Sequence, residues 1–343
     1  MDETAAHSDR MHTISVVIPV YQGERTLPSV VSEVTEVGDG VSPAGVAYRV
    51  TEIVLAYDNG GDRSDEVIRE LEETNPLVRG VWLSRNFGQH AATLAGMASS
   101  SGDWVVTMDE DGQHDPRDFG AMLDVALAVR AQVVYAKPTN PPPHGALRNA
   151  ASRGAKSVVN RAFGARNASD FNSYRFILGS IARGVAAYAG SGVYLDVALG
   201  WVAGRYATAP TELRGETRKS GYTPLRLASH FWRLVLTSGT RALRLVSVLG
   251  VLFAVVGVVL AIWIVVLKLT QDFSAQGWAS TVVIILVVSG AILFSLGIIA
   301  EYIGVSVNMA LGKPAYLITS DPARGPLGRP HQPTPDSAAP GSE

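Results

Sequence analysis

The sequence predicts an α/β fold built on a mostly parallel sheet, followed by a C-terminal pair of membrane-spanning helices. Two observations lead to this prediction. Residues 13–137 alternate short runs rich in β-branched residues with amphipathic stretches, and two long uncharged runs follow near the C-terminus. Strands that are apolar along their whole length and alternate with helices are typical of a parallel sheet covered on both faces.

Five runs have the length and composition of strands, and the segments between them have helical periodicity. The predicted strands are 13–20, 52–57, 78–84, 103–109 and 131–136, and the predicted helices lie near 26–37, 62–74, 88–100 and 116–130. The proline-rich stretch 138–145 ends this pattern, because proline fits neither a helix interior nor a central strand.

The composition excludes some classes of protein. The 343 residues carry a net charge of −2, so no global basic field favours binding to nucleic acid. The chain has no cysteine, which excludes disulfides and thiolate metal sites.

Residues 245–307 predict a transmembrane hairpin. Its spans are expected at about 245–268 and 280–303, each long enough for a hydrocarbon core of roughly 30 Å at 1.5 Å per residue. Basic residues such as Arg244 and Lys313 flank the hairpin, whereas the loop between the spans is nearly uncharged. By the positive-inside rule both termini face the cytoplasm. The sequence thus predicts an integral protein of the inner or cell membrane with a cytoplasmic soluble part.

Two further segments are expected at the membrane interface. Basic residues alternate with apolar ones at helical spacing in residues 146–163, and a second such segment, 225–244, leads into the first span. Basic amphipathic helices of a membrane-bound protein bind anionic lipid headgroups. The predicted organisation is a flexible tail (1–12), a cytoplasmic domain (13–224), an interfacial helix (225–244), the hairpin (245–307) and a cytoplasmic tail (308–343) that is disordered after about 320.

Polar clusters follow four of the predicted strands. They are PVYQGE (19–24), DNGGD (58–62), RNFGQ (85–89) and DEDGQ (109–113). In parallel sheets, ligands bind beyond the carboxyl ends of the strands. The four clusters are therefore expected to form one site.

The fourth cluster belongs to the acidic stretch TMDEDGQHDP, residues 107–116. Asp109 and Asp111 are two residues apart, so they point the same way if the strand continues through them. Such a carboxylate pair can bind a hard divalent cation that also contacts phosphate oxygens, and Gln113 would add a neutral oxygen ligand. A solvated acidic turn is the alternative interpretation.

The motifs SVVIPVYQGERTL, EIVLAYD, RNFGQHAATLAG, MDEDGQHDP and RGETRKSGY occur in this order along the chain. With them the chain resembles family 2 glycosyltransferases of the GT-A fold. Its nearest branch is similar to the polyprenyl-phosphate glycosyltransferases, which include dolichyl-phosphate mannose synthase and bacterial two-span membrane members. The resemblance covers about residues 13–318 and implies a Rossmann-like GT-A domain.

The resemblance also implies roles for individual residues. Those expected to bind the donor nucleotide are Pro19, Tyr21, Glu24, Asp58, Arg85 and Asp109. The implied ligands of Mg²⁺ or Mn²⁺ are Asp109, Asp111 and Gln113. The implied catalytic residues are Asp111, Asp170 and, in a loop that folds over the donor phosphates, Arg214 and Arg218. The implied acceptor-phosphate residues are Lys137, Arg148 and Ser152. Asp170 or Ser173 would occupy a further acidic position of the family, and a helix N-cap is the alternative role for Asp170.

The implied reaction is the inverting transfer of a sugar from a nucleotide sugar to polyprenyl phosphate. A UDP-sugar is the favoured donor and GDP-mannose the second. The expected partners are this donor, the lipid acceptor and the bilayer, and small residues of the second span, such as Gly290 and Gly297, are compatible with a homo-oligomer, a tetramer or dimer. Two alternatives remain: a processive polysaccharide synthase, and a catalytically silent membrane-anchored protein that binds a nucleotide sugar.

Overall fold

The computed structural model describes residues 11–140, 171–190, 194–214 and 277–324, together with isolated positions between 250 and 266. The elements up to residue 140 are β1 (His12–Val20), α1 (Leu27–Val37), β2 (Asp39–Val41), β3 (Ala47–Tyr57), α2 (Ser64–Thr74), β4 (Val78–Leu83), α3 (Gln89–Ala98), β5 (Trp104–Thr107), the 3₁₀ turn η2 (Pro116–Asp118), α4 (Phe119–Val129) and β6 (Val133–Pro138). The later elements are β7 (Arg175–Leu178), α6 (Gly179–Tyr188), α7 (Leu195–Val202), β8 (Tyr206–Thr211), α10 (Trp278–Ala310) and β9 (Ile318–Thr319).

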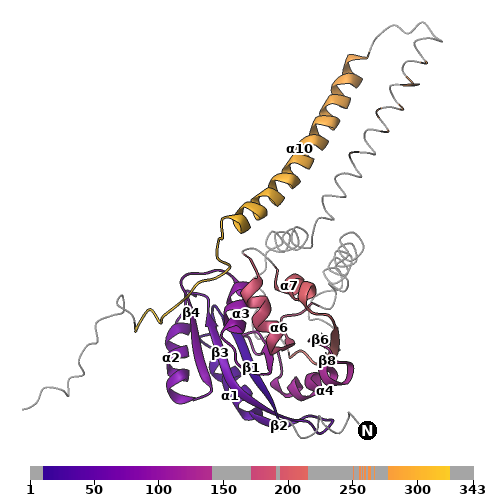
Figure 1. Cartoon of the computed structure of the whole chain (residues 1–343). Coiled ribbons are helices and arrows are strands. Elements are labelled where there is room, and N and C mark those ends of the chain that lie inside the picture. Colours follow the sequence, from indigo (N-terminus) through magenta and orange to yellow (C-terminus); the bar gives the residue numbers. More distant parts are fainter. Residues whose placement is uncertain are drawn as a thin grey trace, which may run out of the picture.

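The described strands form one mixed, mostly parallel sheet (Figure 1). Its order is β8-β6-β7-β5-β1-β3-β4-β9, and β2 pairs with β3. β1 lies between β3 and β5 and is parallel to both. β7 is antiparallel to both of its neighbours, β5 and β6. The predicted α/β class and the five predicted strands are confirmed.

Side chains on the two faces of the sheet enter separate hydrophobic cores. Along β1, Val16 and Ile18 pack on one face with residues of α1 and α4, whereas Val17 packs on the other face with residues of α3, α6 and α7. This division follows from the two-residue period of a strand. Because both faces are covered, β1 is apolar along most of its length, which is the pattern that the sequence analysis used.

One glycine allows a helix to approach the sheet closely. A Cβ atom at Gly96 in α3 would overlap the side chain of Val17 in β1. Any larger residue would push α3 away from the sheet and displace its first turn, which lies at the carboxyl edge.

Several elements have no counterpart in the sequence analysis. Residues 171–214 contain β7, α6, α7 and β8, for which no strand or helix was predicted. β7 is only four residues long and lies between β5 and β6, so its stability comes from pairing on both sides, which a local pattern does not reveal. The predicted interfacial helices, 146–163 and 225–244, lie outside the described residues.

The C-terminal helix α10 projects away from the sheet and its covering helices (Figure 1). Within the described part of the chain it is the one helix long and apolar enough to cross a membrane, over Val287–Gly304. Only 6% of that span is buried against the rest of the structure. The first predicted span, 245–268, lies outside the described residues apart from isolated positions, so the hairpin stays a prediction.

The segment after α10 returns to the edge of the sheet. β9 pairs antiparallel with β4. Two residues later, both carboxylate oxygens of Asp321 accept hydrogen bonds from the Arg69 guanidinium of α2, at 2.8 and 2.9 Å. The predicted tail from residue 308 therefore contains an ordered strand and a partly buried ion pair before the end of the described residues at 324.

Replacing Asp321 with asparagine removes the charge that Arg69 faces in this partly buried site. We expect Asp321→Asn to lower the free energy of unfolding by about 1–3 kcal/mol, measured by chemical denaturation in detergent. Arg324→Gln is the matched control, because Arg324 is 57% exposed and its contacts with Glu73 and Asp321 are 3.6 and 3.7 Å. Equal effects of the two substitutions would contradict a specific role for the Arg69–Asp321 pair.

Candidate active site

The loops after β1 and β5 are joined by Glu110. Its carboxylate accepts hydrogen bonds from the backbone N–H groups of Tyr21 and Gln22, at 3.0 and 3.1 Å. The loop after β3 lies against the same segment, because a Cβ atom at Gly60 would overlap the carbonyl oxygen of Tyr21. Tyr21 itself exposes 47% of its surface, so its ring is available to a ligand.

The loops after β3 and β4 are joined by Asp58. Its two carboxylate oxygens accept hydrogen bonds from the N–H groups of Phe87 and Gly88, at 2.7 and 2.8 Å. Asp58 is only 3% exposed, and this burial raises the pKa of its carboxyl group although the two N–H donors oppose the shift. The four polar clusters lie at one edge of the sheet, as predicted, and the contact of Asp58 with a nucleotide base stays a prediction.

Asp109 lies just beyond the end of β5 and is held from two sides. One of its oxygens accepts a hydrogen bond from Gln89 Nε2 at the start of α3, and the other accepts one from Ser173 Oγ, both at 2.6 Å. Its backbone N–H donates to Nδ1 of His114, which is stacked on Tyr174 at 4.7 Å between ring centroids. Burial lowers the pKa of His114, which favours the neutral ring that accepts this bond.

Asp111 forms a local unit with Gln113. The carboxylate accepts hydrogen bonds from the backbone N–H and the side-chain Nε2 of Gln113, at 3.1 and 3.0 Å. Burial and the neighbouring charge of Asp109 raise the pKa of Asp111. A bound cation would offset this like-charge repulsion.

The donor set at this point fits a hard divalent cation that a substrate completes. Asp109 and Asp111 offer carboxylate oxygens and Gln113 offers an amide oxygen, which are the ligand types that Mg²⁺ and Mn²⁺ prefer. Among the described residues, no three histidine, cysteine or acidic side chains converge as a complete metal site. Further ligands would therefore have to come from substrate oxygens or water.

Arg214 follows β8 and lies over the acidic loop. Its guanidinium pairs with Asp115 at 2.8 Å and with Glu33 of α1, and its backbone N–H donates to the carbonyl oxygen of Gln113 at 3.1 Å. Burial opposes ionisation of Asp115, but the N–H of Arg117 and the Arg214 guanidinium together keep its pKa below the usual value. The structure therefore brings Arg214 beside the predicted metal ligands.

A fully buried ion pair connects β7 and α7 close to this edge. The Arg175 guanidinium donates to both carboxylate oxygens of Asp196 in α7, at 2.6 and 2.8 Å. It also donates to Thr107 Oγ1 and to the carbonyl oxygen of Ser173. Arg175, Asp196 and His114 were not identified from the sequence; a charged pair in otherwise apolar segments was the available signal.

The structure also describes four other predicted site residues. Pro19 is buried in β1, opposite Ala56 in the register of β3. Glu24 pairs with Arg63 at 2.9 Å, and the exposed Arg85 stacks over the Phe87 ring at 4.1 Å. Lys137 is exposed near the end of β6. Four predicted residues lie outside the described part of the chain: Arg148, Ser152, Asp170 and Arg218. Their roles stay predictions.

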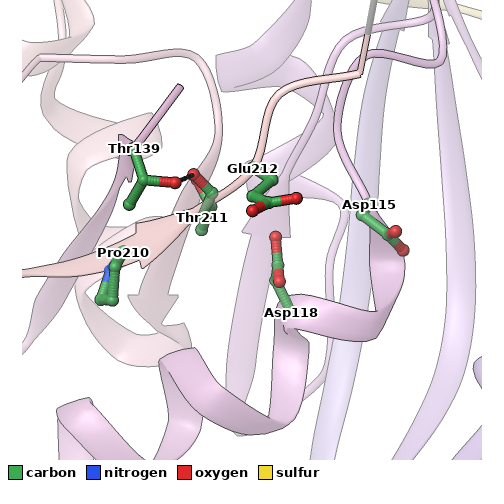
Figure 2. A pocket seen from close by; sticks show the side chains of 6 residues that line it. All are labelled: Asp115, Asp118, Thr139, Pro210, Thr211 and Glu212. Atoms are coloured by element: carbon green, nitrogen blue, oxygen red, sulfur yellow. Dashed lines mark hydrogen bonds between the residues drawn. The ribbon is translucent and has the colours of Figure 1, made fainter. Parts of the chain in front are cut away.

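Asp118, the last residue of η2, immediately precedes α4. It faces a cavity that it shares with Asp115 and Glu212 (Figure 2). Burial, with the charges of Asp115 and Glu212, raises the pKa of Asp118 to about 6, although Arg214 opposes the shift. Ionised Asp118 therefore destabilises the folded state, and this destabilisation grows as the pH rises from about 4 to 6.

Replacing Asp118 with asparagine removes this pH dependence. We expect Asp118→Asn to match the wild type near pH 4 and to exceed its unfolding free energy by about 1–2 kcal/mol above pH 7, after allowance for solvent screening. Denaturant melts of both proteins between pH 4 and 7.5 measure the difference. A difference that stays constant with pH would contradict the raised pKa.

Removing one partner of the buried pair leaves an uncompensated charge. We expect Asp196→Asn to lower the unfolding free energy by about 3–5 kcal/mol. Asp39→Asn is the matched control, because the Arg49–Asp39 pair is 48% and 61% exposed and its loss is expected to change the unfolding free energy little. Urea melts of the two variants test this, and similar midpoints would refute the supporting role of Asp196.

Comparisons with known proteins place the chain in a family. The family model described as "Glycosyl transferase family 2" matches residues 15–182. An undecaprenyl-phosphate 4-deoxy-4-formamido-L-arabinose transferase of Aeromonas hydrophila is 29% identical over 89% of this chain and 92% of the relative. The protein of that name from Pseudomonas fluorescens is 28% identical over 90% of this chain and 89% of its own.

A crystal structure of glucosyl-3-phosphoglycerate synthase from Mycobacterium tuberculosis, in complex with Mn²⁺, UDP-glucose and phosphoglyceric acid, is 20% identical with a TM-score of 0.45. It covers 69% of this chain and 81% of the other. A likeness at this level carries no argument about function. The family match and the relatives that extend over most of the chain show that it belongs to glycosyl transferase family 2 and is a glycosyltransferase.

Proposed function

We propose that this glycosyltransferase moves a sugar from a nucleotide sugar to the phosphate of a polyprenyl phosphate at the cytoplasmic face of the membrane. The observation that carries the proposal is the Asp109–Asp111 pair, held at the carboxyl edge of the sheet beside Arg214. The relatives named as undecaprenyl-phosphate sugar transferases support the class of acceptor. The apolar helix α10 supports a reaction at a membrane.

In this proposal, a phosphate oxygen of the acceptor attacks the anomeric carbon of the donor sugar. The bond from that carbon to the diphosphate oxygen breaks, so the nucleoside diphosphate leaves with the electron pair and the configuration inverts. The second pKa of a phosphate monoester is about 6, so the acceptor is mostly ionised at pH 7 and needs no strong general base. Positioning and charge shielding are the main requirements.

Residues of this chain would meet those requirements from two sides. A Mg²⁺ or Mn²⁺ ion held by Asp109, Asp111 and Gln113 would neutralise charge developing on the leaving diphosphate. Arg214 would exchange its bonds with Asp115 and Glu33 for bidentate contacts with phosphate oxygens. Lys137, together with Arg148 and Ser152, is proposed to hold the acceptor phosphate.

The donor is proposed to be a UDP-sugar, with GDP-mannose as the second candidate. Asp58, Glu24, Tyr21, Pro19 and Arg85 would surround its nucleotide at the edge formed by β1, β3 and β4. Arg218 and Asp170 complete the proposed catalytic set. The basic residues that flank the apolar spans support a cytoplasmic catalytic domain with both termini on that side.

Product formation by the purified full-length protein tests this function. The assay contains detergent, a short-chain polyprenyl phosphate, Mg²⁺ or Mn²⁺, and a panel of UDP-, GDP- and dTDP-sugars. We expect one donor to give a metal-dependent glycolipid. Asp111→Asn should reduce its rate at least about 100-fold, because the charge opposing the leaving group is lost.

Glu70→Gln serves as the control for loss of one acidic charge, because Glu70 is exposed on α2, away from the site. Full activity of Asp111→Asn would refute the proposed metal site. Binding of a nucleotide sugar without turnover by the wild type would favour the silent binding protein, and a polymeric product would favour the processive synthase.

A further inference from the structure

A cavity of about 400 Å³ opens beside Arg214, between the ends of β6 and β8 and the start of α4. Asp115, Asp118, Thr139, Pro210, Thr211 and Glu212 line it. Figure 2 shows the carboxylates of Asp118 and Glu212 pointing toward one another across this space. Its size is within the usual range of small-molecule sites.

Among the described residues, two buried polar atoms of cavity-lining side chains have no hydrogen-bond partner: Asp118 Oδ2 and Thr211 Oγ1. Thr211 is only 4% exposed, and the hydroxyl of Thr139 donates to its carbonyl oxygen rather than to its hydroxyl. Buried polar atoms are nearly always satisfied, so two such atoms in one cavity point to a ligand that carries hydrogen-bonding groups.

The charges of the cavity restrict that ligand. Among the described residues, Arg214 pairs with Asp115 and Glu33, and no ion pair forms to Asp118 or Glu212. An anionic group would be repelled by these two carboxylates, and Arg214, the cation whose charge acts on Asp118, is already paired with Asp115 and Glu33. Hydroxyl and ammonium groups instead donate hydrogen bonds to carboxylate oxygens.

The position of the cavity relates it to the proposed reaction. Asp115 both lines the cavity and pairs with Arg214, and the backbone of Arg214 is bonded to Gln113. Asp115 thus connects the cavity to Arg214, the residue that the proposed function places on the donor diphosphate.

We propose that this cavity receives the sugar ring of the donor through hydroxyl or amino groups, and that Asp118 and Glu212 disfavour donors whose sugar carries a carboxylate. This inference rests on the proposed function. Asp118 and Thr211 would hydrogen-bond to hydroxyl or amino groups of the sugar. Glu212, which is exposed, would repel a carboxylate at the opening of the cavity.

Equilibrium binding tests the proposal without requiring turnover. The full-length protein in detergent is titrated with a nucleoside diphosphate, with its hexose and with its hexuronate. The probes are UDP, UDP-glucose and UDP-glucuronate, or GDP, GDP-mannose and GDP-mannuronate, according to the base that the wild type binds. We expect the wild type to bind the hexose at least about 10-fold more tightly than the hexuronate.

Asp118→Asn and Glu212→Gln should each narrow that ratio at least about 5-fold while leaving the affinity for the nucleoside diphosphate unchanged. Thr211→Val keeps the shape of the side chain and removes a hydroxyl that has no partner in the described part of the chain. It should weaken the hexose about 5-fold without lowering the melting temperature. Glu70→Gln is the control and should match the wild type in every titration.

An unchanged hexose-to-hexuronate ratio in both charge variants, or wild-type hexose affinity in Thr211→Val, would overturn the inference while the proposed transferase function stands. Failure of the wild type to bind either nucleoside diphosphate would instead refute the proposed function at the donor step, and the inference with it. The titration with the nucleoside diphosphate alone therefore distinguishes failure of the inference from failure of the proposed function.

Discussion

The buried ion pair between Arg175 and Asp196 is the interaction on which the geometry of the candidate site depends. Two charges removed from water are tolerated only when each is fully compensated. Here the guanidinium bonds both oxygens of Asp196 and also the Thr107 hydroxyl and the Ser173 carbonyl. Because Ser173 in turn donates to Asp109, the pair links α7, β7 and β5 to the first carboxylate of the predicted metal site.

The acidic stretch after β5 is tolerated because each acid has different partners. Glu110 holds the loop after β1, Asp109 is bound by Gln89 and Ser173, and Asp115 is paired with Arg214. Asp111 accepts hydrogen bonds from Gln113 and has no ion pair among the described residues, and burial and the charge of Asp109 raise its pKa. The least compensated charge is thus the one that the proposed function assigns to a cation.

The apolar helix α10 and the sheet are connected through contacts at the edge of the sheet where β4 lies. β9 follows α10 and adds to β4, and Asp321 then pairs with Arg69 of α2. The proposed acceptor stays in the bilayer, so the proposed donor site needs a defined height above the lipid. A strand pairing and an ion pair on the same short segment restrict how α10 and the sheet move relative to each other.

Local periodicity and the direction of parallel strands were enough to predict the five main strands, the helices between them and the edge at which their polar loops meet. It also located the carboxylate pair, Asp109 and Asp111. Three features became visible only in the folded chain. Ser173 bonds Asp109, β7 enters the sheet antiparallel, and a cavity opens beside Arg214, with two lining side chains that hold a polar atom without a partner among the described residues. These features depend on contacts between residues far apart in the chain, and no local pattern encodes such contacts.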